Sequence, residues 1–225
     1  MESFRIGEIE EILINAFPAV EREIYDGWIL NFSGGYTYRA NCINPFYSSS
    51  YGLEEKIRHC EDQYRELFMP VVYKMTSAVS GDLDDLLEKK GYPVVKYVDV
   101  LYRSLEDWNG DLWTDLGQDY EIITMSRMDE EWLDGVNQLI DIPFSSLEKV
   151  QKKIFGRICL PMVCVKIRCR GRVIGTGLGV MERHYIGLYA IHVHKDYRQK
   201  GLAMKICGNI MTRGKSMGAD KAHLQ

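Results

Sequence analysis

The spacing of hydrophobic residues along the chain predicts helices and strands throughout its first half. Apolar residues at helical spacing indicate an amphipathic helix from Phe4 to Phe17 and another from Leu53 to Phe68, each followed by a proline. A shorter helix from Leu83 to Lys90 closes at Gly91. Apolar and β-branched runs predict strands at Trp28 to Phe32, Tyr36 to Ile43, Val71 to Met75 and Val94 to Arg103.

The second half begins after a polar, acidic stretch without hydrophobic periodicity, which is typical of a connector. We therefore expect a first unit at residues 1–105, a connector at 106–119 and a second unit at 120–225. The pattern of the second unit predicts one or two helices between Met128 and Phe155 and a helix from Gly201 to Met217. The predicted strands are Tyr120 to Met125, Met162 to Arg168, Val173 to Met181, Tyr185 to Val193 and one beginning at Lys221.

Composition and charge narrow the class of protein. The 225 residues are 46% hydrophobic and 27% charged, which is ordinary for a globular protein, and the net charge of -4 argues against nucleic acid as a partner. Six cysteines occur without a C-x-x-C pair, and no signal peptide precedes them, so we expect a cytoplasmic protein with reduced thiols. No apolar run approaches the roughly 20 residues that span a bilayer, so we expect no membrane attachment.

The two halves repeat one local order of elements. In the second half Val193-His194 precedes Gly201-Leu202, and a helix and another strand follow. In the first half Asn44-Pro45 precedes Gly52-Leu53 with nearly the same spacing. The repeat indicates shared ancestry of the halves, although a strand, a turn and a helix are also a common unit that chance can repeat.

The segment from Val193 to Ala203 joins a buried strand, a basic turn and the start of an apolar-striped helix. Backbone N–H groups in the first turn of a helix have no partner inside the helix, and the helix dipole makes this end positive. Gly201 allows an anion to approach the backbone closely. This stretch is therefore predicted to cradle a phosphate group.

These residues resemble the signature of the GNAT superfamily of acyl-CoA-dependent N-acyltransferases, Arg/Gln-x-x-Gly-x-Gly/Ala after a strand. The signature reads here Arg198-Gln199-Lys200-Gly201-Leu202-Ala203, and Tyr197 and the preceding glycine-rich hairpin fit the same order. The resemblance covers residues 120–225 directly. The first half resembles a degenerate second copy, as in tandem members that share the segments Tyr25-Asp26-Gly27-Trp28 and Arg39-Ala40-Asn41.

The resemblance implies an α/β (α+β) fold in two related units, each with a mixed, largely antiparallel sheet flanked by helices. It implies transfer of an acetyl group from acetyl-CoA to a primary amine by direct attack, without a metal. Backbone amides from Arg198 to Ala203 are implied to hold the pyrophosphate, and the strand backbone at Ile191 and Val193 to pair with the pantetheine arm. The implied cofactor-binding residues are Ile191, His192, Val193, Arg198, Gln199, Lys200, Gly201, Leu202 and Ala203.

Tyr189 is the candidate catalytic residue, because several members of the family keep a polar residue there, facing the acceptor. Strand alternation places it on one face with Ile191 and Val193, and His192 on the other. Tyr189 would orient the acceptor or a water, or else it is a half-buried strand aromatic. His192 and His194 titrate near neutral pH when unperturbed. The alternative to a role in proton transfer is that His192 packs under the helix and His194 ends the strand in solvent.

Several features leave alternatives open. The family continues with a further helix and two strands, whereas this sequence stops at Gln225, so we expect either a shortened sequence or another segment over the last strand's edge. This departure leaves a second hypothesis, a catalytically inactive acyl-CoA-binding or dimerisation module. Gly175, Gly177 and Gly179 would permit a bend or the approach of a ligand. Acidic residues at the acceptor side could select a cationic amine, or simply be solvated: Glu130, Glu131 and Asp134.

The predicted partners are therefore acetyl-CoA and a small-molecule or peptide amine, with a homodimer as a further possibility. The identity of the amine and the length of the acyl chain stay open.

Overall fold

A computed structural model describes residues 6–110, 117–140 and 145–225 of the chain. It divides into two compact units, one formed by residues 1–97 with 144–158 and the other by 98–143 with 159–225. These bounds differ from the boundary expected near residue 105 in two ways. Helix α5 (Ser145–Gly156) groups with the first unit, and strand β4 (Leu101–Ser104) with the second.

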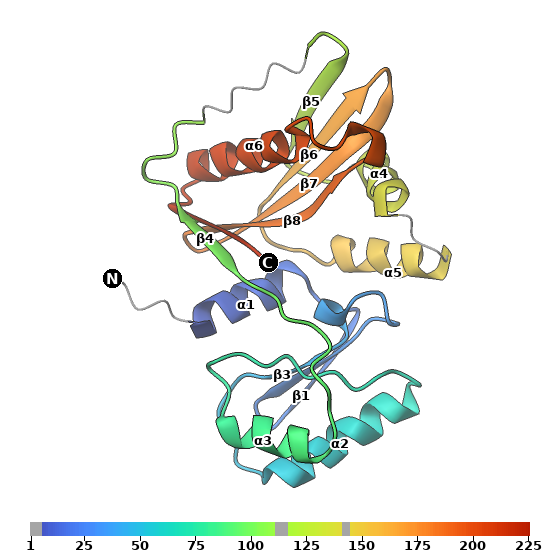
Figure 1. The fold of residues 1–225 in the computed structure, drawn as a ribbon, viewed down its shortest axis with the longest axis vertical. Helices are drawn as coiled ribbons and strands as arrows, with labels where there is room; N and C mark the ends of the chain where they lie inside the picture. The colour runs from blue at the N-terminus through green and yellow to red at the C-terminus, as the bar shows by residue number, and fades with distance from the viewer. Residues whose placement is uncertain (1–5, 111–116, 141–144) are drawn as a thin grey trace. The chain divides into compact units, whose positions relative to one another are not determined.

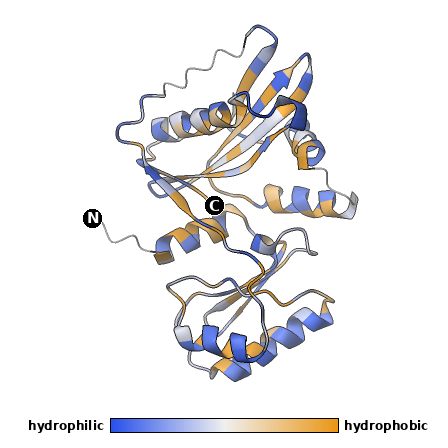
Figure 2. Ribbon diagram, viewed as in Figure 1, coloured by the Kyte–Doolittle hydropathy of each residue, from blue (hydrophilic) through white to orange (hydrophobic). Residues whose placement is uncertain are grey.

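The first unit is built on a three-stranded antiparallel sheet, with the order β1 (Glu21–Tyr25), β2 (Trp28–Phe32) and β3 (Ile43–Pro45) (Figure 1). Residues 72–74 run parallel to β3 through backbone hydrogen bonds with Ile43. The helices of this unit are α1 (Ile6–Ala16), α2 (Leu53–Glu66), α3 (Gly81–Lys89) and α5, with a 3-10 turn at Tyr38–Ala40. In Figure 2 α2 is largely hydrophilic, and its buried apolar side chains join the core of the sheet.

The hairpin of the first unit differs from the expected one. The expected strand Tyr36 to Ile43 is instead a loop, the 3-10 turn and the start of β3, and the unpredicted β1 pairs with β2. Asp26 and Gly27 form the two-residue turn between them with φ values of +41° and +81°. Asp-Gly between apolar runs is a strong signal for this kind of hairpin turn. The expected strand Val94 to Arg103 is regular only in β4.

The second unit contains a six-stranded sheet in the order β4-β9-β8-β7-β6-β5. All neighbours are antiparallel except β8 and β9, which are parallel. Strand β4 pairs with β9 along its whole length. A segment from before the connector therefore covers the edge of the last strand, as one of the two alternatives expected. The other strands are β5 (Tyr120–Met125), β6 (Met162–Cys169), β7 (Arg172–Glu182), β8 (Tyr185–Val193) and β9 (Lys221–Leu224).

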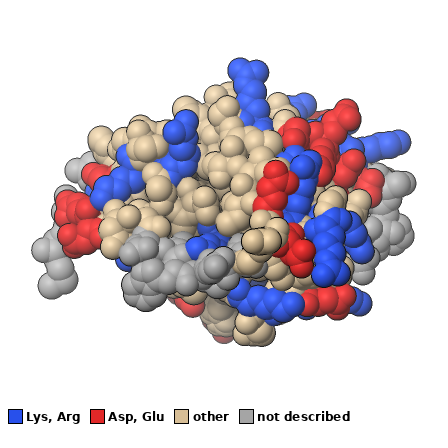
Figure 3. Space-filling model, turned by 90° about the horizontal axis from the view of Figure 1, so that it is seen from above, with Lys and Arg blue, Asp and Glu red and all other residues tan. Residues whose placement is uncertain are grey.

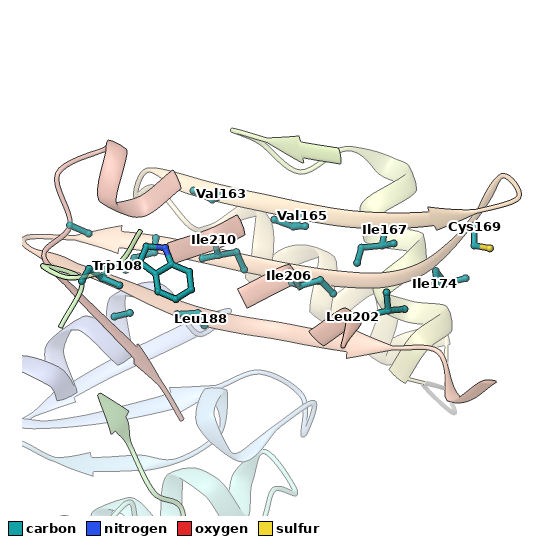
Figure 4. Close-up of a cluster of buried hydrophobic side chains, with 14 residues drawn as sticks. Trp108, Val163, Val165, Ile167, Cys169, Ile174, Leu188, Leu202, Ile206 and Ile210 are labelled. Atoms are coloured by element: carbon teal, nitrogen blue, oxygen red, sulfur yellow. The ribbon is translucent and has the colours of Figure 1, made fainter. Parts of the chain in front are cut away.

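Two helices cover opposite faces of this sheet. Helix α4 (Glu130–Ile140) is preceded by Asp129, whose carboxylate accepts the backbone N–H of Trp132 at 2.7 Å. Gly135 of α4 lies against Val173 and Thr176 of β7. On the other face, α6 (Leu202–Ser216) directs Leu202, Ile206 and Ile210 into the main core of the unit (Figure 4).

Glycines on β7 bring α6 unusually close to the sheet. A Cβ atom at Gly177 would lie 2.1 Å from Cγ2 of Ile206, and one at Gly179 would lie 2.5 Å from Cγ2 of Ile210. Such distances are impossible for real side chains, so only glycine permits this packing. The alternating glycines of this strand therefore serve helix packing, rather than the approach of a ligand.

We predict that Gly177→Ala destabilises the protein by about 1–3 kcal/mol or more, because the added methyl group must displace Ile206. Urea unfolding measures this loss. In Ile206→Ala the obstructing methyl group is gone, so the double variant should lose less than the sum of the two single losses. Gly156→Ala is the control, since nothing lies within 4 Å of its added methyl group. A Gly177→Ala variant as stable as the parent would contradict this account of the packing.

Candidate functional site

One cavity of the second unit collects most of the predicted cofactor residues. Its volume is about 590 Å³, and it lies at the end of β8 and the start of α6. Eight of the nine predicted residues line it, and Leu139, Tyr197 and Met204 complete the lining. The lining residues among those predicted are Ile191, His192, Val193, Arg198, Gln199, Gly201, Leu202 and Ala203. Lys200 does not line it and lies over the ring of Tyr197, 5.1 Å from its centroid.

The turn before α6 has a backbone shaped for an anion. Gln199 and Gly201 have left-handed φ values of +61° and +75°, and Gly201 is the N-cap of α6 without a side-chain cap. The amide groups of the first turn are therefore left for water or a ligand. The Arg198 side chain folds back, and its Nε donates to the carbonyl oxygen of Val193 at 3.1 Å. The guanidinium thus lies beside the mouth of the turn and adds positive charge there.

Strand β8 has one open edge beside this turn. It pairs with β9 only from Tyr185 to Leu188. On that side, residues 189–193 pair with no strand among the described parts of the chain. Their backbone groups can accept and donate hydrogen bonds as a sheet edge does. The open edge runs directly into the turn at residues 195–201.

A β-bulge changes which side chains of β8 share a face. Thr176 pairs with His192 and Leu178 with Tyr189, so Ala190 and Ile191 together lie opposite Gly177, and Ala190 has a φ of +48°. Ile191 and Val193 consequently pack on the α6 side with Leu188. Tyr189 lies on the other side, so the expected alternation that placed it with Ile191 and Val193 is wrong.

Tyr189 and the two nearby histidines occupy distinct environments. Tyr189 is buried, and its ring meets the ring of His223 edge-on at 6.0 Å. His192 lines the cavity on the α4 side, not under α6, and burial lowers the pKa of its imidazole. His194 caps the short helical turn at Lys195–Tyr197, since its Nδ1 accepts the N–H of Asp196.

Acidic residues at the start of α4 are held by the sheet. Lys166 is buried on β6, and its Nζ lies 2.6 Å from Asp129 Oδ2 and 2.5 Å from Glu131 Oε2. Arg168 also binds Glu131, and the hydrogen bonds from Arg168 and Lys166 lower the pKa of this carboxyl group to about 2. Glu131 is therefore committed to the fold, which argues against its selecting a cationic amine.

Sequence reasoning missed His223 and the polar anchor of the first unit. There the Asp26 carboxylate accepts the N–H groups of Ser50 and Tyr51, and it pairs with the buried ammonium of Lys56 at 3.2 Å. No signal pointed to His223, because a histidine near the end of a short strand is unremarkable. For Asp26 the pair Asp-Gly indicates the hairpin turn. Nothing in the sequence indicates that its carboxylate also binds backbone amides and Lys56.

Neither a membrane-spanning helix nor a cluster of metal-binding side chains occurs among the residues that the structure describes. No helix in the described part of the chain combines the length and hydrophobicity that crossing a membrane requires. Over the same residues, no group of three or more His, Cys, Asp or Glu side chains is arranged to hold a metal ion.

Comparison with solved structures shows the GNAT fold. A GCN5-related N-acetyltransferase from Kribbella flavida is 10% identical, with a TM-score of 0.65 over 98% of this chain and 85% of that one. The corresponding enzyme from Sphaerobacter thermophilus is 15% identical, with a TM-score of 0.59 over 90% of this chain and 72% of its own. A tandem GNAT protein from the clavulanic acid biosynthesis pathway is 9% identical, with a TM-score of 0.57 over 76% of this chain and 60% of its own.

Comparison by sequence gives the family. Among curated proteins no relative matches this chain. The family described as "Probable histone acetyltransferase Rv0428c C-terminal" matches residues 4–225, which is almost the whole chain. The chain belongs to this family and is an acetyltransferase of the GNAT superfamily.

Proposed function

We propose that the second unit binds acetyl-CoA in the cavity at the start of α6 and transfers the acetyl group to a primary amine. The observation that carries the proposal is the continuity of the open edge of β8 with the uncapped N-terminus of α6 in one cavity. A long ligand with amide groups at one part and a pyrophosphate at another matches these two surfaces. Acetyl-CoA supplies an acyl thioester when bound, and the remaining roles belong to the protein.

The backbone does most of the proposed binding. The amides from Gln199 to Ala203 face the pyrophosphate, where the positive end of the α6 dipole adds to their attraction. Arg198 and Lys200 contribute charge near the same group. The backbone of Ile191 and Val193 pairs with the pantetheine arm as a neighbouring strand would. The thioester is thereby led toward Tyr189, at the point where β8 and β9 join.

The acceptor is proposed to be an amine that attacks the thioester directly. Only a neutral amine is nucleophilic, so an incoming ammonium must lose a proton at the site. The family description names a probable histone acetyltransferase, which supports an amine of a protein as one acceptor class beside small-molecule amines. Tyr189 remains the candidate for orienting the acceptor.

Other expectations about the protein's surroundings remain predictions. Lys and Arg side chains are mixed with Asp and Glu over the face shown in Figure 3, which fits the expectation that nucleic acid is not a partner. The cysteines in the described residues are free thiols, which fits a reducing cytoplasm. A homodimer also stays a prediction.

The proposed reaction predicts that CoA thiol is released from acetyl-CoA only when a suitable amine is present. A panel of small amines and lysine-containing peptides, followed with a thiol reagent, measures this release. The exposed thiol of Cys159 also reacts with such reagents, so a Cys159→Ser variant gives a cleaner baseline. Tight binding of acetyl-CoA without turnover on any amine would support the inactive-module hypothesis instead.

We further propose that the first unit is a degenerate copy of the second. In both units three antiparallel strands lead into a helix that returns to a segment parallel to the third strand: β1-β2-β3 with α2, and β6-β7-β8 with α6. Gly52 is the N-cap of α2, as Gly201 is of α6, but its φ is −66° instead of positive. The shared order of elements supports common descent.

The cradle of the first unit already contains an anion. The Asp26 carboxylate accepts the amides of Ser50 and Tyr51, which precede Gly52 as Gln199 and Lys200 precede Gly201. Lys56 lies under this carboxylate with no exposed side-chain surface. An internal carboxylate thus takes the position that a phosphate would take, so the first unit should not bind acetyl-CoA.

We therefore predict one acetyl-CoA per chain by calorimetry, together with a rise in thermal stability. Ligand at 100 times its Kd should stabilise the protein by about 2.7 kcal/mol. Gly201→Trp should abolish both signals, because the indole fills the cradle. Gly201→Ala tests the backbone strain alone, and Gly52→Trp places the same bulk at the matching position of the first unit and should leave binding intact. Undiminished binding by Gly201→Trp would refute the placement of the pyrophosphate.

A further inference from the structure

The point where β8 and β9 separate carries two polar side chains, those of Tyr189 and His223, and the proposed function gives no role to His223. The strands pair in register from Tyr185 with Lys221 to Leu188 with Leu224, and Gly187 lies opposite His223. The side chains of Tyr189 and His223 point to the face away from α6, on which a Cβ atom at Gly187 would also lie. Leu188 and Ala222 belong to the core under α6. The separation of the strands is also where the thioester would lie in the proposed function.

His223 is a buried histidine whose polar atoms are unsatisfied. Its residue is 1% exposed, and neither ring nitrogen has a hydrogen-bond partner among the described residues. Burial lowers the pKa of the imidazole to about 4, so the ring is neutral near pH 7, with one N–H donor and one lone pair. Buried polar groups normally find partners, and an exception in a native fold calls for an explanation.

The hydroxyl of Tyr189 lies close to His223 on the same face. A Cβ atom at Gly187 would lie 2.6 Å from Nε2 of His223 and also 2.6 Å from the hydroxyl oxygen of Tyr189. Both atoms therefore converge above Gly187, which has no side chain to separate them. The two rings lie 6.0 Å apart at 80°. Regular alternation before the bulge produces this convergence, because Gly187 and Tyr189 share one face of β8 and His223 lies opposite Gly187.

Aromatic packing alone does not explain why this position holds a histidine. The ring of His223 also lies 6.3 Å from that of Tyr185, so an apolar ring such as phenylalanine would fill the same space. Phenylalanine would leave no orphaned nitrogens behind. The presence of an imidazole beside a tyrosine hydroxyl, at the end of the proposed thioester path, favours a role for its polar atoms.

We propose that His223 is a positioning residue for Tyr189, an inference that rests on the proposed function. When the acyl donor is bound, neutral Nε2 accepts the hydrogen of the Tyr189 hydroxyl. The hydroxyl oxygen then directs its lone pairs toward the incoming amine, accepts a hydrogen bond from it and aligns it with the thioester. His223 takes no proton from the substrate in this role, and Tyr189 is the residue that contacts the acceptor.

The test compares His223→Phe with His223→Gln, whose amide can replace Nε2 as an acceptor. His223→Phe should lower kcat by about tenfold to a hundredfold, as expected for a misaligned acceptor. It should leave the thermal shift with acetyl-CoA unchanged. His223→Gln should recover a large part of the rate. The exposed His184 of the same unit gives the matched control, His184→Gln, which should behave as the parent.

Tyr189→Phe and the double variant show whether the two residues act together. If His223 acts only through Tyr189, the kcat of the double variant Tyr189→Phe with His223→Phe is no lower than that of Tyr189→Phe alone. Parental kcat in His223→Phe, or losses that multiply in the double variant, would overturn the proposal. Urea unfolding of each variant separates these effects from loss of the fold.

A second readout does not depend on turnover. In CoA-saturated protein, Tyr189→Phe should move the imidazole ¹⁵N signals of His223, which are assigned by their absence in His223→Gln. The phenyl ring keeps the edge-on ring contact and removes only the hydroxyl. Unmoved signals refute the hydrogen bond whether or not the enzyme is active. A parent that binds CoA but turns over no amine, with moved signals, refutes the proposed reaction and leaves the Tyr189 contact standing.

Discussion

The close packing of α6 on β7 is the constraint on which the candidate site depends. Ile206 and Ile210 enter the space that side chains at Gly177 and Gly179 would fill, so the helix axis lies near the sheet. Gly214 repeats the device near the end of the helix, where an added Cβ would meet Ile186 at 2.8 Å. With three contacts along its length, α6 has little freedom to slide. Its N-terminal turn is therefore fixed at the end of β8.

Strand β8 directs side chains of the candidate site to both faces of the sheet, because a bulge interrupts its regular alternation once. Before the bulge, Tyr189 faces away from α6; after it, Ile191 and Val193 face toward α6. An uninterrupted strand would place Tyr189, Ile191 and Val193 on one face, and the side chains of Ile191 and Val193 would be lost from the core under the helix. The bulge thus separates the side chain proposed to face the acceptor from the backbone edge proposed to bind the donor. A left-handed Ala190 is unfavourable for an L-residue, and this local cost fits a functional position.

Much of this arrangement could be predicted because it is encoded locally. The bounds of β8 follow from its apolar run, and the Gly201 turn follows from the charge and glycine pattern around it. The bulge could not be predicted, since it reflects the pairing of β8 with β7, and nothing in the letters at 189–191 marks it. The pairing of β4 with β9 is likewise invisible, because it joins residues more than a hundred positions apart. The role of Glu131 on α4 depends on Lys166 and Arg168, which lie on β6, far away in the sequence.

The two helix N-termini, in units that we propose to be related, differ in whether a side chain of the protein binds their amides. Around α6 the turn is left-handed at Gly201 and no side chain caps it, so the amides remain for a ligand. Around α2 the turn is extended at Gly52, and Asp26 binds its amides while Lys56 balances the charge. The hydrogen bonds from these groups, that of the Tyr51 amide above all, hold the pKa of the Asp26 carboxyl group far below its usual range, as expected of an anion in such a cradle. A carboxylate tethered by a two-residue hairpin turn needs no dissolved ligand and gives up no translational freedom on binding, so the first unit can use this anion purely for stability.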